Sequence, residues 1–482
     1  MPTYLITVAG EIPLRSKKTR SRLYYRLIDN IRRRLARRNI TLQVAKVIDA
    51  KILVETQVEA LQELSRVFGV HRVSEVQVLE FRDLGELAKE IASRTIEHVR
   101  DRKFAVRVKR SGRHGFTSLD VAREVGALLK PYSKGVDLEN PDIEVEVEVR
   151  GNKAYLYNNV AMGPGGLPLG SSGRALVLFS GSFDSPVAAW MIAKRGVEVD
   201  FLHYVMGSSE VSRQAFSVAR KLSEEWLSSY NPRFITVDFT PLIAEIEERI
   251  EWSYRQVVLR ALMYMVADKI ATELGYNTIV TGEALSQASS QTLANLVAVE
   301  SAVSPRSIIL RPLIGFDKEE IIEYSRRIGL YDYSSRVAET CAIAPTHVVT
   351  RISSEKLKSL IERLDVRLVE RMAGEYRVVD VFSASPEEAV PSYSEEIDSI
   401  PGDSIIIDVR SYEEYKRDAL PGAIHLSMVD FNNLPRDKPV VLYCTTGGIS
   451  LLLARELRGK GFKAYSLRGG LARYRAGLEK TR

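Results

Sequence analysis

The chain has 482 residues, of which 27% are charged and 45% hydrophobic, with a net charge of +6 and two cysteines. At roughly 100–200 residues per domain, this length predicts three or four domains. The composition excludes collagen-like and low-complexity proteins. Two cysteines exclude a disulfide scaffold and a four-cysteine metal site. The start lacks the pattern of a signal peptide, and no apolar run approaches the ~18–20 residues of a membrane span. We therefore expect a soluble, cytoplasmic protein.

The positive charge is concentrated in the first third. Residues 1–170 contain 30 Lys or Arg and 21 Asp or Glu, whereas the remainder contains 38 and 41. Two dense basic clusters with an uncompensated excess favour a nucleic acid as partner, although an isolated cluster is equally compatible with a solvated helix face. The candidate nucleic-acid-binding residues are Arg15, Lys17, Arg107, Lys109, Arg110 and Arg113, although the charge does not say which nucleic acid they bind.

Two small α+β units are predicted first in chain order. The first unit has strands near 3–9, 42–47, 51–55 and 73–80, a helix through about residue 38, and a helix at 58–66. The second has helices near 84–98 and 118–130 and strands at 104–109 and 143–149. The glycine-rich stretch 163–173 then resembles a linker.

Apolar strands alternate with helices after the linker, which predicts a parallel α/β sheet. The predicted elements cover 175–180, 187–195, 198–205, 211–228, 233–238, 241–272 and 277–281. Residues 352–372 have the pattern of a charged helical connector, and a separate α/β unit follows. The expected domains are 1–78, 79–168, 174–350, a helical linker at 351–387, and 388–482.

A strand-to-helix turn at Ser180–Pro186 is a candidate phosphate site. It joins the apolar strand Ala175–Phe179 to a helix, and backbone N–H groups at a helix N-terminus bind anions. No Gly-x-x-x-x-Gly-Lys-Ser/Thr occurs in the chain, so a P-loop kinase or GTPase lacks its lysine. The segment resembles the pyrophosphatase loop, Ser-Gly-Gly-x-Asp-Ser, of ATP-dependent adenylating enzymes. Ser182 departs from that pattern at the second glycine.

Three longer segments carry a family resemblance. Gly10–Lys17, Thr281–Leu296 and Ile309–Lys318 resemble the signature of the tRNA 4-thiouridine sulfurtransferases, a family also linked to thiamine thiazole synthesis. The resemblance covers essentially the whole chain. It implies a multidomain α/β and α+β fold: a ferredoxin-like domain and an RNA-binding THUMP domain, a Rossmann-like adenylating (PP-loop) domain with a parallel sheet, and a C-terminal rhodanese domain.

The resemblance also implies an ATP site with Mg²⁺. The implied ATP-binding residues are Leu178, Phe179, Ser180, Gly181, Ser185, His203, Tyr204, Arg260, Gly282 and Gln291. Asp184 would organise Mg²⁺ and the phosphates, and Lys318 would stabilise developing negative charge. Taken alone, His203 is as well explained as a hydrogen-bonded residue at a strand end, and Lys318 as the start of a solvated helix. The six histidines have no ligand spacing, so no zinc site is predicted.

The two cysteines are Cys444 and Cys341. Cys444 follows the apolar strand 440–443 at a strand-to-helix turn, where a thiol ionises more readily. Its surroundings resemble a rhodanese loop, which implies a persulfide carrier. A Cys-x₅-Arg phosphatase is disfavoured because position 450 is serine. The resemblance implies that Cys341 pairs with the rhodanese cysteine, Cys444, during turnover.

The implied reaction is the ATP-dependent thiolation of a tRNA uridine, expected at position 8, with Cys444 and Cys341 as catalytic thiols. The implied partners are the tRNA acceptor arm, a cysteine desulfurase as sulfur donor and an external reductant. We also expect a homodimer and no membrane association. Two alternatives stay open: a rhodanese-type sulfur carrier for thiazole synthesis, and a tRNA-binding module with weakened adenylation.

Overall fold

A computed structural model describes residues 1–206, 209–288, 290–337, 349–390, 393–445, 447–471 and 474. The chain divides into two units, Met1–Ser171 (unit 1) and Ser172–Arg482 (unit 2), and each is described by itself. None of the described helices is both long enough and apolar enough to cross a membrane.

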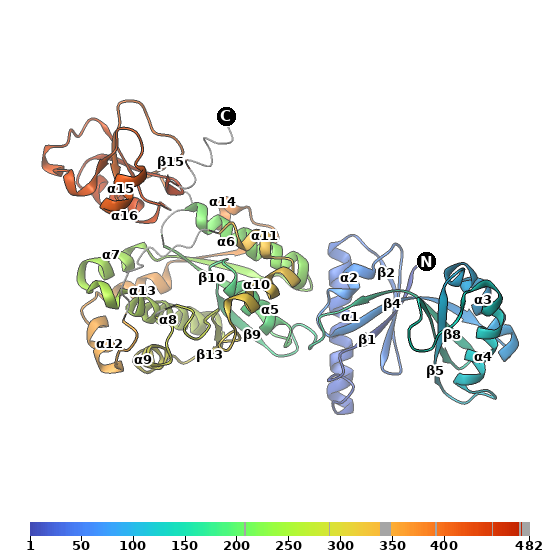
Figure 1. The fold of residues 1–482 in the computed structure, drawn as a ribbon. Helices are drawn as coiled ribbons and strands as arrows, with labels where there is room; N and C mark the ends of the chain where they lie inside the picture. Colours follow the sequence, from blue (N-terminus) through green and yellow to red (C-terminus); the bar gives the residue numbers. More distant parts are fainter. Residues whose placement is uncertain are drawn as a thin grey trace. The chain divides into compact units, whose positions relative to one another are not determined.

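Unit 1 is built on one continuous eight-stranded sheet in the order β2-β3-β1-β4-β8-β7-β5-β6 (Figure 1). Its strands are β1 (Thr3–Val8), β2 (Leu42–Ile48), β3 (Lys51–Thr56), β4 (Val70–Glu80), β5 (Lys103–Ser111), β6 (Gly135–Val136), β7 (Ile143–Arg150) and β8 (Lys153–Met162). The long strand β4 pairs with β1 through its first half and with β8 along most of its length. The two predicted α+β units therefore share one sheet.

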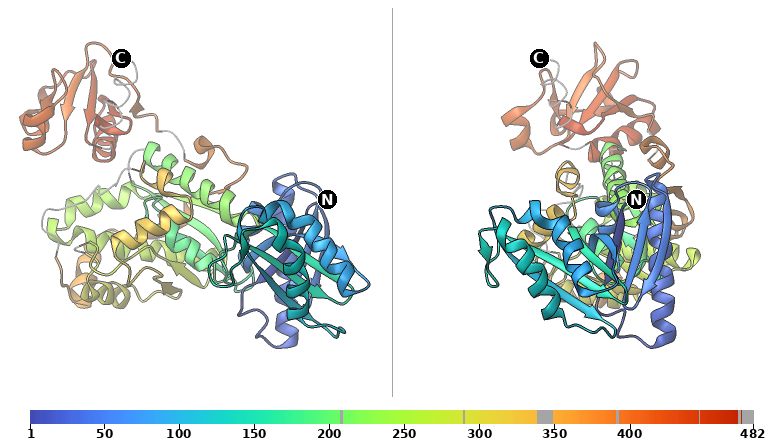
Figure 2. Two further views of the ribbon diagram at one scale, coloured as in Figure 1. Left: turned by 45° about the vertical axis from the view of Figure 1, so that its right-hand side comes forward. Right: turned by 90° about the vertical axis from the view of Figure 1, so that its right-hand side faces the viewer.

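Four helices cover one face of this sheet: α1 (Lys17–Arg37), α2 (Leu61–Ser65), α3 (Leu84–Val99) and α4 (Ser118–Leu129). Helix α1 buries Leu23, Leu27, Ile31 and Leu35, which recur every four residues and so form one apolar stripe. This stripe packs with residues of β1, β3 and α2 in one core, while α3 and α4 form a second core over β5, β7 and β8. Figure 2 shows the same helices and strands from two other sides.

The opposite face of the sheet carries an apolar patch beside a group of ion pairs. The patch consists of Leu5, Leu53, Val76 and Tyr155. Next to it the buried Glu148 forms ion pairs with Lys51 and Arg150 and accepts a hydrogen bond of 2.6 Å from the Tyr157 hydroxyl. The other acidic residues that alternate along β7 are also paired, Glu146 with Arg72 of β4 and Glu144 with Arg107 of β5.

The glycine-rich stretch 163–173 packs against unit 1 in its first part. Gly69 donates its N–H to Gly165, and the Asn30 side chain donates to the carbonyl of Leu169 at 3.0 Å. A Cβ at Gly163 would lie 2.3 Å from the carbonyl oxygen of Val70, so only glycine fits this approach. Unit 1 ends two residues after Leu169, within this stretch.

Unit 2 begins with a six-stranded sheet in the order β13-β12-β9-β10-β11-β14. The strands are β9 (Arg174–Leu178), β10 (Glu198–Val205), β11 (Arg233–Asp238), β12 (Thr278–Val280), β13 (Ile308–Leu310) and β14 (Tyr376–Asp380). The first five pair in parallel, as the alternating pattern predicts, and β14 adds an antiparallel edge to β11.

Helices lie on both faces of this sheet (Figure 1). They are α5 (Asp184–Ala193), α6 (Ser209–Leu222), α7 (Thr240–Arg249), α8 (Arg255–Leu274), α9 (Leu293–Val303), α10 (Lys318–Arg327), α11 (Tyr331–Ser334), α12 (Ser354–Ile361), α13 (Arg367–Gly374) and α14 (Pro386–Ala389). The predicted helical stretch 241–272 is two helices, because Ile250 after α7 takes an extended conformation.

Residues 351–387, which we expected as a helical linker, contribute to the core of this layer. Leu357, Leu360, Val369 and Met372 are each at most 3% exposed and pack in one cluster with α7, α8 and α9. The segment then continues into β14, which joins the sheet. These residues therefore pack as part of the adenylating-type fold rather than as a free connector.

A five-stranded parallel sheet completes unit 2, in the order β15-β19-β18-β16-β17. Its strands are β15 (Glu396–Ile397), β16 (Ile405–Asp408), β17 (Ile424–His425), β18 (Pro439–Tyr443) and β19 (Lys463–Leu467). Helices α15 (Tyr412–Asp418) and α16 (Gly448–Gly459) connect them. The predicted thiol turn lies between β18 and α16.

Candidate active site

A cavity of 390 Å³ opens at the carboxyl ends of β9, β10 and β12, beside α8. This edge is where open parallel sheets bind ligands. Nine of the ten residues predicted to bind ATP line it, together with Asp184. The nine are Leu178, Phe179, Ser180, Ser185, His203, Tyr204, Arg260, Gly282 and Gln291. The structure thus brings together residues spread over more than 100 positions of sequence.

The tenth residue, Gly181, lies in the turn itself. Its φ is +82°, and a Cβ would meet the Cα of Ala215 at 2.6 Å. The Ser185 hydroxyl accepts hydrogen bonds from the N–H groups of Ser180 (3.1 Å) and Gly181 (3.3 Å). The residue that departs from the loop pattern, Ser182, places its hydroxyl 2.8 Å from that of Ser180. The extra side chain therefore adds a hydroxyl to the loop.

Gly282 lies opposite this loop, after β12. A Cβ there would lie 2.8 Å from the backbone N of Ser185 and 2.9 Å from the carbonyl carbon of Asp184. No other residue fits so close to the start of α5. Gly282 thus lets the end of β12 approach the start of α5, while Gly181 lets the loop pack against Ala215 of α6.

Asp184 and Lys318 form an ion pair at the mouth of the loop. Lys318 Nζ lies 3.0 Å from Asp184 Oδ1, and both side chains keep partial exposure, 34% and 21%. The Gln287 amide also donates to Asp184 at 3.2 Å. Lys318 begins α10, where Asp317 forms a capping box with Glu320. Because the capping box fixes the start of α10, the backbone of Lys318 has a fixed position beside the loop. Lys318 itself does not line the cavity.

His203 is held by protein groups on both ring nitrogens. Nδ1 lies 2.8 Å from the carbonyl oxygen of Phe179 and Nε2 lies 2.9 Å from the Ser212 hydroxyl. Burial lowers the pKa of His203 to about 4, so the ring is neutral at physiological pH. The geometry of His203 is compatible with both interpretations, as a residue of the ATP site and as a hydrogen-bonded residue at a strand end, because it lines the cavity and both ring nitrogens have partners.

Glu283 is a lining residue that the sequence reasoning missed. Its buried carboxylate pairs with Arg260 and with Arg311 (2.7 Å), and it accepts hydrogen bonds from the hydroxyls of Tyr264 (2.5 Å) and Thr281 (3.0 Å). Burial by itself raises its pKa, but these cations and hydroxyls outweigh burial and leave the pKa below the ordinary 4.5. Glu283 therefore stays ionised and fixes the position of Arg260.

The lining contains polar groups that suit a nucleotide. Arg260 Nε and Gln291 Oε1 are buried without a hydrogen-bond partner among the described residues. Leaving such groups unpaired costs about 1–3 kcal/mol each, which a ligand bound in the cavity would offset. An amide oxygen accepts from an amino group, and a guanidinium donates to phosphate. Together with the glycine-lined loop, this donor and acceptor set fits ATP.

No cluster of three or more His, Cys, Asp or Glu side chains that could hold a metal ion occurs in the described part of the chain. The described lining contains two carboxylates, Asp184 and Glu283. Glu283 is occupied by protein donors. Asp184 is thus the carboxylate that could meet a Mg²⁺ ion carried mainly by phosphates and water, the usual mode for this ion.

Cys444 lies directly after β18 and is buried. Its Sγ accepts a hydrogen bond from the N–H of Gly447 at 3.0 Å, and the Ser450 hydroxyl lies 3.6 Å away. Gly447 has a φ of +90°, and a Cβ at Gly470 would lie 2.5 Å from the carbonyl oxygen of Cys444. One backbone N–H and one hydroxyl therefore donate to the sulfur in a tight loop, which suits a thiolate or a persulfide.

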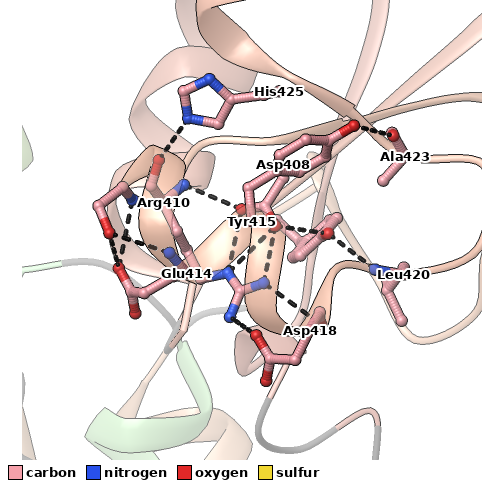
Figure 3. A network of polar contacts seen from close by, with 10 residues as sticks. Asp408, Arg410, Glu414, Tyr415, Asp418, Leu420, Ala423 and His425 are labelled. Atoms are coloured by element: carbon pink, nitrogen blue, oxygen red, sulfur yellow. Dashed lines mark hydrogen bonds and ion pairs between the residues drawn. The ribbon is translucent and has the colours of Figure 1, made fainter.

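A buried polar network anchors the strand that leads to Cys444 (Figure 3). Arg410 pairs with Asp408 at 2.7 Å and with Asp418 at 2.9 Å. The hydroxyl of Tyr443 donates to Asp408 at 2.7 Å and accepts from the N–H of Leu420 at 3.0 Å. Burial raises the pKa of Asp408, but the bonds from Arg410 and Tyr443 outweigh it and lower that pKa overall. The residue before the thiol is thereby fixed.

Cys341, the second predicted thiol, lies outside the described residues. The basic residues predicted to contact RNA are all exposed and all belong to unit 1. Arg15 precedes α1, Lys17 begins it, Arg107, Lys109 and Arg110 belong to β5, and Arg113 follows β5. Arg107 already pairs with Glu144 at 3.0 Å, whereas Lys109 has no ion-pair partner among the described residues.

Four family models match the chain. Residues 4–74 match the ThiI ferredoxin-like domain, 79–159 the THUMP domain, 170–366 the thiamine biosynthesis protein (ThiI), and 392–476 the rhodanese-like domain. These matches and the sheets described above confirm the predicted fold class.

Relatives and solved structures are similar over most or all of the chain. A tRNA sulfurtransferase from Desulfurococcus amylolyticus is 99% identical over 482 residues, which is 100% of each chain. A tRNA sulfurtransferase from Thermoplasma acidophilum is 36% identical and covers 96% of this chain and 94% of its own. The crystal structure of a 4-thiouridine synthetase–RNA complex with bound ATP has a TM-score of 0.68 at 30% identity, covering 79% of this chain and 99% of that one.

Identity of this extent, with matched domains from residue 4 to residue 476, leads to one conclusion: the chain belongs to the tRNA sulfurtransferase (ThiI) family of enzymes.

Proposed function

We propose that this enzyme uses ATP to activate a tRNA uridine, expected at position 8, and replaces its O4 with sulfur to give 4-thiouridine. The observation that carries the proposal is the cavity at the strand ends, where the loop at 180–186 meets Gly282, Arg260 and Gln291. Support also comes from the similar 4-thiouridine synthetase, whose structure holds RNA and ATP.

The activation step would use the residues of this cavity. ATP would lie with its phosphates on the loop of Ser180, Gly181 and Ser185, at the N-terminus of α5. Uridine O4 attacks the α-phosphate and pyrophosphate leaves. Arg260, which lines the cavity, and Lys318, which pairs with Asp184, would stabilise the charge that develops. Bound Mg²⁺, met by Asp184, would neutralise phosphate charge.

The sulfur step would use the two thiols. Cys444 accepts a sulfur atom from a donor and becomes a persulfide, whose terminal sulfur attacks C4 of the activated base. Cys341 then attacks the Cys444 sulfur and breaks the S–S bond to the transferred sulfur. AMP departs with the original O4, the new sulfur stays on C4, and a Cys341–Cys444 disulfide remains. Two electrons from an external reductant restore both thiols.

The proposed partners follow from this chemistry. A cysteine desulfurase supplies the persulfide sulfur, and tRNA is recognised by its acceptor arm. Shape and backbone recognition suit the basic surface of unit 1. We place the reaction in the cytoplasm, because tRNA is the substrate, and we propose a homodimer as the active form.

The test uses purified protein, ATP, tRNA, a desulfurase and cysteine, with mass spectrometry of the tRNA nucleosides. Cys444→Ala should abolish 4-thiouridine but leave pyrophosphate release that depends on both ATP and tRNA, because Cys444 is needed only after activation. Cys341→Ala should allow at most one turnover per enzyme. Persistent thiolation by Cys444→Ala would rule out the carrier role.

Two outcomes would favour the alternatives. If the wild-type chain binds tRNA but neither binds ATP nor releases pyrophosphate, it is a tRNA-binding module with weakened adenylation. Residues 170–366 match the thiamine biosynthesis protein (ThiI) family. This match favours a second role as sulfur carrier for thiazole synthesis. A fragment of residues 388–482 that restores thiamine synthesis but not tRNA thiolation would support that role.

A further inference from the structure

A second cavity, of 640 Å³, lies in unit 1 between α1 and the β2–β3 hairpin at the edge of the sheet. Its volume is within the range of about 300–1,000 Å³ that is typical of small-molecule sites. No step of the proposed reaction uses it. Its wall combines basic and aromatic side chains: Arg20, Tyr24 and Tyr25 from α1, and Lys46 from β2.

The charge of this wall is positive. Arg20 and Lys46 lie on opposite sides of the cavity, and neither has an ion-pair partner among the described residues. Asp49 also lines the cavity, but it pairs with Arg150 of β7. Two uncompensated cations facing one cavity favour an anionic ligand.

The aromatic side chains add the second feature. Tyr25 is 77% exposed, which is unusual for a large ring on a helix whose other face is packed. Its neighbour Tyr24 is 6% exposed, and its hydroxyl is buried without a hydrogen-bond partner among the described residues. Burial raises the pKa of Tyr24, opposed by the charge of Arg20, so the hydroxyl stays protonated and can donate.

An exposed ring in the same cavity as two cations suits a nucleotide of single-stranded RNA, because the base can stack on the ring and the phosphate can meet the cations. A protein partner fits less well, because the apolar lining residues Ile28 and Val47 share the cavity with these two cations. We propose that this cavity receives one unpaired nucleotide of the bound tRNA, with its base on Tyr25 and its phosphate between Arg20 and Lys46. The inference rests on the proposed tRNA substrate.

The first test measures the affinity of the full chain for fluorescently labelled tRNA by anisotropy. Base stacking is worth about 1–3 kcal/mol, so Tyr25→Leu should weaken binding at least fivefold, while Tyr25→Phe, which keeps the ring, should bind like wild type. Because Tyr25 is exposed, neither change should disturb folding. Binding of Tyr25→Leu within twofold of wild type would overturn the proposal.

A matched pair of charge variants tests the phosphate contact. Arg20→Ala and Arg22→Ala remove the same charge from the same helix, but only Arg20 lines the cavity. Arg20→Ala should lower the slope of log affinity against log salt by about one contact, and more than Arg22→Ala does. Equal effects of the two variants would contradict a phosphate site in the cavity.

Crosslinking locates the nucleotide directly. With unsubstituted tRNA, short-wavelength ultraviolet light, which excites all four bases, should attach RNA to the tryptic peptide 23–26, which holds Tyr24 and Tyr25, in wild type and not in Tyr25→Leu. Crosslinks confined to other peptides would overturn the proposal. Thiolation at saturating tRNA separates the two hypotheses: if wild type makes no 4-thiouridine, the proposed function fails, whereas normal thiolation with unchanged Tyr25→Leu binding defeats this inference alone.

Discussion

Gly181 and Gly282 determine how closely the backbone can approach a nucleotide in the candidate active site. The turn at Gly181 has a left-handed φ of +82° and touches Ala215, and Gly282 approaches the start of α5. A methyl group at Gly181 would push the loop away from α6, and one at Gly282 would force apart two segments that both line the cavity. Both glycines are therefore needed because a side chain would not fit. The sequence pattern of the loop predicts this for Gly181.

We expect Gly181→Ala and Gly282→Ala each to weaken ATP binding at least tenfold, a free-energy change of about 1.4 kcal/mol. The Cβ contacts of 2.6 and 2.8 Å require the loop or its neighbour to move. Isothermal titration with ATP measures the change. Gly315→Ala is the control, because a Cβ at Gly315 meets nothing within 4 Å. Unchanged ATP affinity in both variants would show that the loop does not cradle the phosphates.

The buried carboxylate of Glu283 holds two arginines in the candidate active site. Glu283→Gln removes the charge that holds Arg260 and Arg311. Loss of a partner from a buried pair typically costs about 3–5 kcal/mol. We therefore expect lower stability of unit 2 and a raised KM for ATP, with a smaller change in kcat. The control is Glu300→Gln, which removes a half-exposed partner of Arg311 and leaves Arg260 in place. Equal effects of the two variants would contradict the role of Glu283.

The stability effect of Glu283 should depend on pH. Its pKa in the folded chain lies below the ordinary 4.5, so its contribution is complete above about pH 4.5 and is lost as pH falls through the folded value. The difference in unfolding free energy between wild type and Glu283→Gln should be constant above about pH 4.5 and should shrink as pH falls below it. Urea unfolding followed by tryptophan fluorescence measures it. A difference that grows on acidification would have the wrong sign.

The candidate site was predictable where local pattern and family resemblance coincide. The loop from Ser180 to Pro186 follows an apolar strand and precedes a helix, so its anion-binding geometry is readable from sequence. Glu283 was missed because its partners Arg260, Tyr264 and Arg311 come from separate elements, and only the fold unites them. Its position next to Gly282, at a strand end, is the signal that could have found it.

Among the strands, those with clear alternation or long apolar runs were predicted from the sequence. Two strands with many exposed residues, β8 and β14, were not. Strand β8 (Lys153–Met162) is absent from the sequence-based expectation, because its second half, Asn158–Met162, is largely exposed. Strand β14 was missed for the same reason: its residues are mostly half-exposed at the sheet edge. Burial on one face gives a strand its pattern, and edge positions weaken it.

Helices α12 and α13 show how an amphipathic segment can resemble a connector. Their charged residues face outward, while Leu357, Leu360, Val369 and Met372 are buried against α7, α8 and α9. The charge content suggests a solvated linker, but the spacing of the apolar residues belongs to packed helices. The residues following the match at 170–366 thus continue the same core.

We expect Leu360→Ala to destabilise unit 2 by about 2–5 kcal/mol, because it would leave a cavity in a core where Leu360 is fully buried. Lys358→Ala, two positions earlier and exposed, is the matched control and should change stability by less than about 0.5 kcal/mol. Urea denaturation gives both values. If Leu360→Ala were as stable as wild type, α12 would not be part of the core.

For the whole molecule, charge and chemistry divide between the two units. The first 170 residues carry an excess of nine basic residues, and the rest an excess of three acidic ones. All predicted RNA-binding residues lie in unit 1, whereas the nucleotide cavity and Cys444 lie in unit 2. The proposed function thus assigns RNA capture and chemistry to parts with separate cores.

This division predicts that ATP stabilises only one unit. Trp190, Trp226 and Trp252 are the three tryptophans of the chain, and all lie in unit 2. Their fluorescence reports on the unfolding of that unit, while far-UV circular dichroism follows both. At 100 times its dissociation constant, a ligand adds about 2.7 kcal/mol of stability to the part that binds it.

ATP should therefore raise the fluorescence midpoint of thermal unfolding by several degrees, because α5 begins in the lining of the proposed ATP cavity and holds Trp190, against which Trp226 packs. Circular dichroism should show a second transition that ATP leaves in place, since the cores of unit 1 include no residue of the cavity. Gly282→Ala should unfold at a midpoint that ATP no longer moves. A single transition that shifts as a whole in both signals would mean that the two units unfold together, and that their separate cores do not make them independent in stability.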